Sequence, residues 1–172
     1  MPDLLGHVAV ARLALELAGV AAVLERGEPA SEDARLACFY LGSILPDLVT
    51  RPFHILFPGC TAYVEVLDSP FCLALWALML SQAFAGPLRR AALRCLSAGI
   101  ATHVVIDLVQ RHIAGGYMLL FPFSVATPTW GLLWPEQSVG LSLALAAVAL
   151  VVEIAARRRR RPATGTDAAV HS

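Results

Sequence analysis

The chain has 172 residues, of which 58% are hydrophobic and 15% are charged, and its mean hydropathy is positive. This composition lies outside the range of ordinary soluble domains, so a single-domain membrane protein is the first expectation. The formal net charge is zero, but all thirteen basic residues are arginine and five of them form the run 157–161. Residues 1–156 therefore carry an excess of acid, which argues against a nucleic-acid-binding surface on the body of the protein.

Four apolar runs predict an all-α protein, a multi-helix integral membrane bundle with about four hydrophobic helices. These runs are residues 4–24, 69–86, 92–116 and 139–156. The last of them is about 18 residues long, near the lower limit for crossing a hydrocarbon core of about 30 Å. A soluble helical core with one C-terminal anchor remains the alternative, because shorter apolar runs are often core helices.

Two proline-containing stretches separate these helices. Residues 45–60 read LPDLVTRPFHILFPGC and predict a loop or a broken helix end, because proline interrupts helical hydrogen bonding. Residues 117–138 contain three prolines and two tryptophans. Tryptophan is favoured at the membrane–water interface, so this second stretch predicts an irregular interfacial segment.

Arginines next to the apolar runs predict the orientation in the membrane. Basic residues beside membrane spans tend to stay in the cytoplasm, so 89–94 and 157–161 are both assigned to that side. We therefore expect an integral protein of the bacterial inner membrane with a cytoplasmic C-terminus. Its helical domain covers residues 1–156, and the basic tail 157–172 is expected to be disordered.

His103 and Asp107 are unusual in a helix that otherwise consists mainly of Ile, Val, Ala and Leu. They are four residues apart, so their side chains lie one above the other on one helical face. An ionisable side chain within a membrane helix costs roughly 2.5–3.5 kcal/mol on insertion scales and normally faces a cavity or a partner. The pair therefore either binds a metal ion or forms a hydrogen bond that fixes helix packing.

Further potential metal ligands lie elsewhere in the chain. His7 is in the first turn of the first predicted helix, Asp47 follows a leucine and a proline, and His54 lies seven residues later. Neutral imidazole and carboxylate together suit zinc, whose catalytic sites leave a position open for water. Water bound to such an ion ionises near pH 7, so the chemistry indicated is metal-assisted hydrolysis.

Three sequence blocks carry a resemblance to a known family. GHVAVA at 6–11, LGSILPDL at 41–48, and GIATHVVIDLV at 99–109 followed by LLFP resemble the membrane-bound metal-dependent hydrolases, the YdjM-like proteins. Their order and spacing are also similar to zinc-dependent phospholipase C and the S1/P1 nucleases. The resemblance covers roughly residues 1–135 and implies that His7, Asp47, His103 and Asp107 are the metal ligands.

The chain departs from this family between the second and third blocks. Members usually carry a histidine-rich H-R-G-x-T-H-S block there, whereas residues 62–75 read AYVEVLDSPFCLAL. The final serine matches at Ser69, but both histidines are missing. Asp68 or Glu65 would then complete the ligand shell or act as the catalytic base, or His54 would take part.

The sequence therefore predicts a membrane-bound hydrolase that binds zinc or a similar divalent ion. Its substrate would be a phosphoester or related ester, including lipid-like ones, and its partner would be membrane lipid. No nucleic-acid partner is expected. The alternative is a non-catalytic membrane scaffold or a degenerate family member, in which buried His–Asp pairs only fix helix packing.

Overall fold

The computed structural model describes residues 4–17, 32–111 and 117–160. Six α-helices make up most of this part of the chain, and none of it forms a named strand, so the all-α prediction is confirmed. The helices are α1 (Leu4–Leu17), α3 (Glu32–Leu56), α4 (Thr61–Leu67), α5 (Pro70–Ser81), α6 (Pro87–Val109) and α7 (Pro135–Arg160). A short 3-10 helix, Pro58–Cys60, connects α3 to α4.

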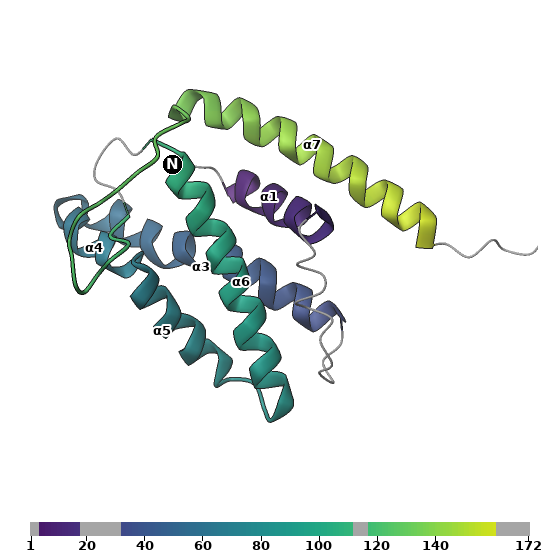
Figure 1. The fold of residues 1–172 in the computed structure, drawn as a ribbon, viewed down its shortest axis with the longest axis horizontal. Helices are drawn as coiled ribbons and strands as arrows, with labels where there is room; N and C mark the ends of the chain where they lie inside the picture. Colours follow the sequence, from purple (N-terminus) through teal and green to yellow (C-terminus); the bar gives the residue numbers. More distant parts are fainter. Residues whose placement is uncertain (1–3, 18–31, 112–116, 161–172) are drawn as a thin grey trace, which may run out of the picture.

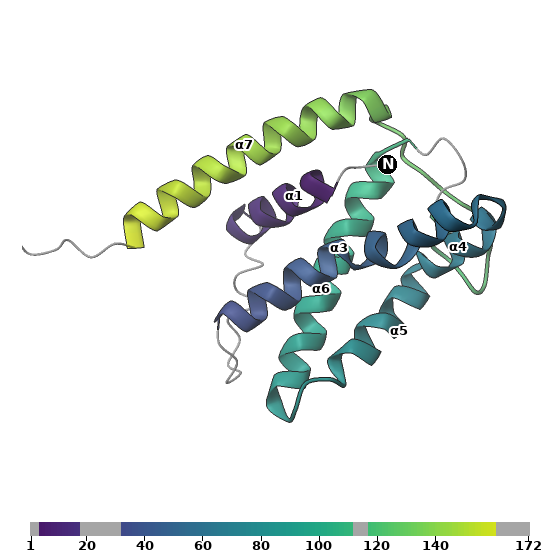
Figure 2. The same cartoon turned by 180° about the vertical axis from the view of Figure 1, so that it is seen from behind.

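The long helices α3 and α6 cross at the centre of the molecule (Figures 1 and 2). On one side α1 packs on both of them, and α7 lies over the outer side of α1. On the other side α5 packs against α6, and α4 lies beside the C-terminal half of α3. Helix α1 is therefore enclosed between α7 and the crossing pair.

Two glycines allow α3 and α6 to approach until their backbones touch. A Cβ atom at Gly42 would lie 2.3 Å from the carbonyl oxygen of Leu96. A Cβ atom at Gly99 would lie 2.1 Å from the carbonyl oxygen of Phe39. Since real Cβ atoms do not come this close to backbone, only glycine fits at either position. The close crossing brings backbone groups of α3 within reach of side chains on α6.

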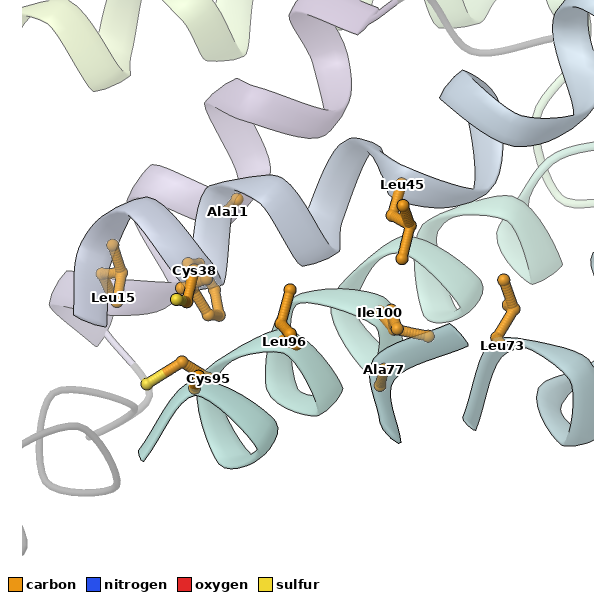
Figure 3. Packing of buried hydrophobic residues seen from close by; sticks show 11 residues of the cluster. Ala11, Leu15, Cys38, Leu45, Leu73, Ala77, Cys95, Leu96 and Ile100 are labelled. Carbon is orange, nitrogen blue, oxygen red and sulfur yellow. The ribbon is translucent and has the colours of Figure 1, made fainter. Parts of the chain in front are cut away.

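The hydrophobic core surrounds this crossing (Figure 3). Phe39 from α3, Leu96 from α6 and Leu73 from α5 are completely buried. Ala11 from α1 and Cys95 from α6 extend the same cluster. Burial of a large apolar side chain is worth about 1.5–3 kcal/mol, so these contacts hold the crossing helices in place.

The prediction of a loop or a broken helix end across residues 45–60 is wrong for 45–56, which are α-helical, and the α-helix is interrupted only at 57–60. Helix α3 runs through Pro46 and Pro52 and ends only at Leu56. Each proline removes one helical N–H donor and normally costs about 3 kcal/mol in a helix interior. The Thr50 hydroxyl donates to the Pro46 carbonyl oxygen at 2.9 Å. Leu45 and Val49, on either side of Pro46, pack into the core that α3 shares with α6. Tertiary contacts therefore outweigh the local preference.

Of the four or so membrane-spanning helices that the sequence predicts, the described residues support one. Within the described ranges only Leu88–Val109 is long and apolar enough to cross a bilayer, and half of its most apolar window is buried inside the protein. The other apolar segments, at Gly6–Leu15, Pro70–Ser81 and Val139–Ala155, are shorter than the roughly 20 residues that a span requires. A core helix of a soluble protein would pass the same length test as Leu88–Val109.

Several sequence predictions fall partly on residues that the structure does not describe. The first predicted helix, 4–24, corresponds to α1 as far as Leu17, and the third, 92–116, corresponds to α6 as far as Val109. Residues 18–24 and 112–116 lie outside the described ranges. Helix α7 continues to Arg160, which is beyond the predicted domain boundary at residue 156, and the rest of the basic tail is not described.

Candidate metal centre

Three buried side chains from two helices meet beside the α3–α6 crossing. His7 comes from α1, whereas His103 and Asp107 come from successive turns of α6. Their exposed fractions are 0%, 1% and 5%. One possible ligand atom from each residue lies within 4.8 Å of the other two. Among the described residues, these three are the group that could hold a metal ion.

A backbone hydrogen bond fixes the orientation of the His103 ring. Its Nδ1–H donates to the Ser43 carbonyl oxygen of α3 at 2.8 Å, a contact that the close helix crossing makes possible. The other ring nitrogen, Nε2, lies 3.2 Å from Asp107 Oδ2. Metal-binding histidines typically use one nitrogen to bond a carbonyl and the other to bind the ion. The bond to Ser43 leaves Nε2 as the His103 atom that could bind an ion.

The His7 ring also turns its Nε2 edge toward the carboxylate of Asp107. Its Nε2 atom lies 3.2 Å from Asp107 Oδ1. The imidazole rings of His7 and His103 are stacked, with centroids 4.0 Å apart and an angle of 22° between the planes. The two Nε2 atoms therefore face the two oxygens of one carboxylate.

His103 Nε2 has to carry a proton or share a cation with the carboxylate, because Nδ1 of the same ring already donates to Ser43. If His103 is neutral, its Nε2 carries a lone pair, because the proton is on Nδ1, and that lone pair would face a carboxylate oxygen. Protonation of His103 alone removes this conflict, since a neutral His7 ring with its proton on Nε2 can donate toward Asp107 Oδ1. Protonation of both rings would stack two cations 4.0 Å apart. A cation shared by both Nε2 atoms and Asp107 is the alternative to a protonated His103.

A buried tyrosine holds the third member of the group. The Tyr117 hydroxyl donates to Asp107 Oδ2 at 2.9 Å, and Tyr117 is only 4% exposed. Burial is the main cause that raises the pKa of Tyr117, and the nearby Asp107 charge raises it further. Tyr117 therefore remains a hydrogen-bond donor at neutral pH. Sequence reasoning missed it because it lies in the segment that was predicted to be interfacial.

Asp47 lies on the opposite side of His7 from Asp107. Its Oδ2 atom is 3.9 Å from His7 Nδ1 and accepts a hydrogen bond from Arg51 Nη2 at 2.8 Å. Asp47 therefore contacts the His7 ring at the nitrogen that does not face the carboxylate of Asp107. At 3.9 Å this contact is an electrostatic one and not a hydrogen bond, so the structure places Asp47 beside His7 but outside the three-residue group.

Asp68 lies close enough to the centre to interact with it electrostatically. It follows α4, and its Oδ1 atom is buried without a hydrogen-bond partner among the described residues. Burial raises the pKa of Asp68 to about 7, and the charges of Asp107 and Asp47 also raise it. His103 and the Thr50 hydroxyl act in the opposite direction. A carboxyl group with this pKa can gain or lose a proton near neutral pH.

Glu65 and His54, the remaining residues singled out from the sequence, lie outside the three-residue group. Glu65 is half-buried on α4, about one turn before Asp68. His54 is half-buried in the last turn of α3, seven residues after Asp47. The structure thus brings His7, His103 and Asp107 together, with Asp47 and Asp68 around them.

Comparison with models of known protein families, with curated proteins and with solved structures finds no match for this chain. The metal preference of the centre is therefore inferred from its own ligand atoms. Two imidazoles and one carboxylate form a ligand set that binds zinc and related divalent ions. Of the two carboxyl groups around this set, Asp68 has a pKa that lets it exchange a proton near neutral pH.

The raised pKa of Asp68 predicts that stability decreases as the pH rises from about 4 to about 7 in the absence of metal. The unfolded chain loses this proton near its ordinary value of 3.8, whereas the folded protein keeps it until about 7. The folded state binds more protons in that window, so each increase in pH favours unfolding. At about 1.4 kcal/mol per pKa unit, the total change is a few kcal/mol.

The measurement is the unfolding free energy of the metal-depleted protein between pH 4 and 8. Asp68→Asn keeps a neutral side chain of similar shape, so it is expected to flatten this part of the profile and to stabilise the protein at pH 8. An unchanged slope in Asp68→Asn would assign the pH dependence to other groups.

Proposed function

We propose that this protein is a membrane-associated hydrolase that binds a divalent metal ion, with zinc as the preferred ion, through His7, His103 and Asp107. Its substrate would be a phosphoester or a related ester. The proposal rests mainly on the two Nε2 atoms that each lie 3.2 Å from an oxygen of Asp107. Ligands bound tetrahedrally to one zinc ion at about 2.0–2.1 Å are about 3.4 Å apart, which is close to these separations.

The type and number of donor atoms also support the proposal. Catalytic zinc sites commonly have three protein ligands and one open position for water or substrate, and two histidines with one carboxylate are a known combination. The three sequence blocks that resemble the membrane-bound metal-dependent hydrolases contain all three residues. Asp107 would be the natural bridge if a second ion were bound.

Each surrounding residue has a distinct role in this proposal. When bound, the ion would polarise the ester oxygen and activate water for attack. Asp68, with its pKa near 7, can accept the proton that the attacking water loses, and Glu65 is the second candidate for this task. Tyr117 and the Ser43 carbonyl hold Asp107 and His103 in position.

Large apolar side chains on the surface support association with a membrane. Leu150 and Val151 of α7 are 60% and 65% exposed, and Phe123 in the segment before α7 is 94% exposed. Soluble monomers rarely expose such side chains over extended areas, so this surface favours contact with lipid or with another protein. The span Leu88–Val109 is consistent with membrane association.

The proposal is tested by metal analysis combined with a hydrolysis assay on the detergent-purified full chain. We expect about one bound zinc ion per chain, together with cleavage of a chromogenic phosphodiester or phosphomonoester that stops after chelation and returns with added zinc. A folded protein that binds no divalent metal would contradict the proposal and favour the membrane scaffold. A protein that binds zinc but cleaves no ester would support the metal site and contradict the proposed hydrolase activity.

A further inference from the structure

Large apolar side chains are exposed on two opposite sides of the molecule. Helix α5 contains no charged residue, and Leu78 and Met79 are exposed on its outer face. Helix α7 has no charged residue across 137–152, and Leu143 and Val148 are exposed on it. The two helices lie on opposite sides of α1 and α6 (Figures 1 and 2). A single protein partner would cover one of these sides, whereas a lipid bilayer surrounds a protein and covers both.

Residues 117–134, which we call the strap, lie at the end of the molecule where α6 ends and α5 begins (Figure 1). The strap amides of Trp130 and Leu132 donate to the last two carbonyl oxygens of α6, each at 2.9 Å. Phe121 contacts Phe71 in the first turn of α5 edge to face, with ring centroids 6.5 Å apart. The strap is therefore held at the same end of α6 as the candidate metal centre.

The side chains of the strap are typical of chain at a membrane surface. None of residues 117–135 is charged, and two of the three tryptophans of the protein are in the strap. Its exposed large side chains are Leu120, Phe123, Val125, Trp130, Leu132 and Trp134. The Arg111 guanidinium lies over the Trp134 ring, 4.2 Å from its centroid. Tryptophan is enriched at the level of the lipid headgroups, and a cation beside it attracts lipid phosphate.

The backbone of the strap limits how deep it can lie in a bilayer. It forms turns and irregular chain rather than a named helix or strand. Backbone polar groups outside helices and sheets need water or polar headgroups, so lipid-exposed irregular chain does not occur within the hydrocarbon core. The headgroup layer, about 5–8 Å thick on each side of a bilayer, is therefore the deepest position available to the strap.

The opposite end of α6 supports this placement. Arg89, Arg90 and Arg94 lie in the first two turns of the helix, whereas the strap lies at its C-terminal end. Basic and aromatic residues both flank membrane spans, and Leu88–Val109 is the described helix that is long and apolar enough to be one. Helix α6 thus has residues suited to a membrane surface at each end.

We infer that the strap lies in the headgroup layer of a lipid bilayer and that the candidate metal centre lies directly beneath it. Asp107 and His103 are two and six residues before the end of α6, which is about 3 and 9 Å along the helix axis. These distances are comparable with the thickness of the headgroup layer, about 5–8 Å. The substrate class that follows, which rests on the proposed function, is the phosphoester of a membrane phospholipid.

The test measures the depth of each tryptophan in the full chain, reconstituted into phosphatidylcholine vesicles. Double substitutions of tryptophan by phenylalanine leave one indole per variant. Quenching by lipids with a nitroxide on the headgroup or near the end of the acyl chain then gives its distance from the bilayer centre. We expect about 15–22 Å for Trp130 and for Trp134, which corresponds to the headgroup layer.

Trp76, the third tryptophan, is the matched control. It lies six residues beyond Pro70, the first residue of α5, so it is expected to be closer to the bilayer centre than the strap by up to about 9 Å. Circular dichroism checks that each variant is folded.

Tryptophans 130 and 134 that neither lipid quenches would overturn the inference and favour a protein partner on the strap. Depths well inside about 15 Å would place the strap in hydrocarbon and would also overturn it. A common depth for all three tryptophans would contradict the position of the strap at one end. The measurement requires neither metal nor turnover, so it separates the two proposals. The expected depths in a protein without bound metal would contradict the proposed function alone, whereas zinc-dependent hydrolysis with an unquenched strap would contradict this inference alone.

Discussion

Replacement of His103 by alanine is expected to abolish stoichiometric zinc binding, with a loss of affinity of at least about 100-fold. That loss exceeds the 10–100-fold typical of changes outside the ligand shell, because a ligand is removed rather than reoriented. The reason is geometric, since Nδ1 of this ring is committed to Ser43 and Nε2 faces Asp107 at 3.2 Å. Elemental analysis and calorimetric titration with zinc measure the effect.

Asp107→Asn removes the negative charge but keeps the shape of the side chain and an oxygen that can accept from Tyr117. It therefore tests the ligand with little disturbance to packing, and the same loss of zinc is expected. The matched control is His54→Ala, which removes a half-buried histidine outside the three-residue group. Zinc binding should be unaffected in this control.

The two ligand variants are also expected to lose the stability that bound zinc gives the wild type. Zinc at 100 times its dissociation constant would stabilise the wild type by about 2.7 kcal/mol, and this increment should disappear in His103→Ala and Asp107→Asn. Zinc binding retained in both variants would contradict the assigned ligands. Zinc lost from His54→Ala would instead make His54 a ligand, as the sequence suggested.

The sequence predicts those parts of the candidate site whose residues are close together along the chain. It does not predict contacts between residues that only the packing of helices brings together. The spacing of His103 and Asp107 places both on one face of a helix, and helical periodicity suffices for that. That His7 joins them depends on how α1 packs against α6, which no periodicity reveals. Tyr117 lies in an irregular segment, and the role of Ser43 depends on its backbone carbonyl rather than its side chain. These two partners left no recognisable pattern in the sequence.

For the fold, too, the sequence predicts local features but not those that depend on helix packing. The apolar run at 69–86 contains α5, and the Ser69 hydroxyl caps this helix by accepting from the Cys72 amide. Such local signals were sufficient to predict an all-helical chain. The continuation of α3 through Pro46 and Pro52 was not predictable from propensity, because packing against α6 compensates for the lost hydrogen bonds. Hydropathy alone also could not distinguish a buried helix from one that spans a membrane.

The α3–α6 crossing gives the second large effect, because Gly99→Ala is expected to destabilise the protein by about 3 kcal/mol or more. Its new Cβ atom would lie 2.1 Å from the Phe39 carbonyl oxygen and 2.7 Å from the Ser43 amide nitrogen, so the two backbones must separate. Separation would also lengthen the bond between Ser43 and His103, so zinc affinity should fall with stability.

Gly140→Ala is the matched control for this substitution. Gly140 lies in α7 with nothing within 4 Å of the added Cβ position, so alanine should stabilise its helix by about 0.5–1 kcal/mol. Chemical denaturation in detergent, with zinc titration of the same samples, measures both quantities. If Gly99→Ala were as stable as Gly140→Ala, the backbone contact between α3 and α6 would be excluded. The close helix crossing would then no longer explain how the Ser43 carbonyl oxygen reaches His103 Nδ1.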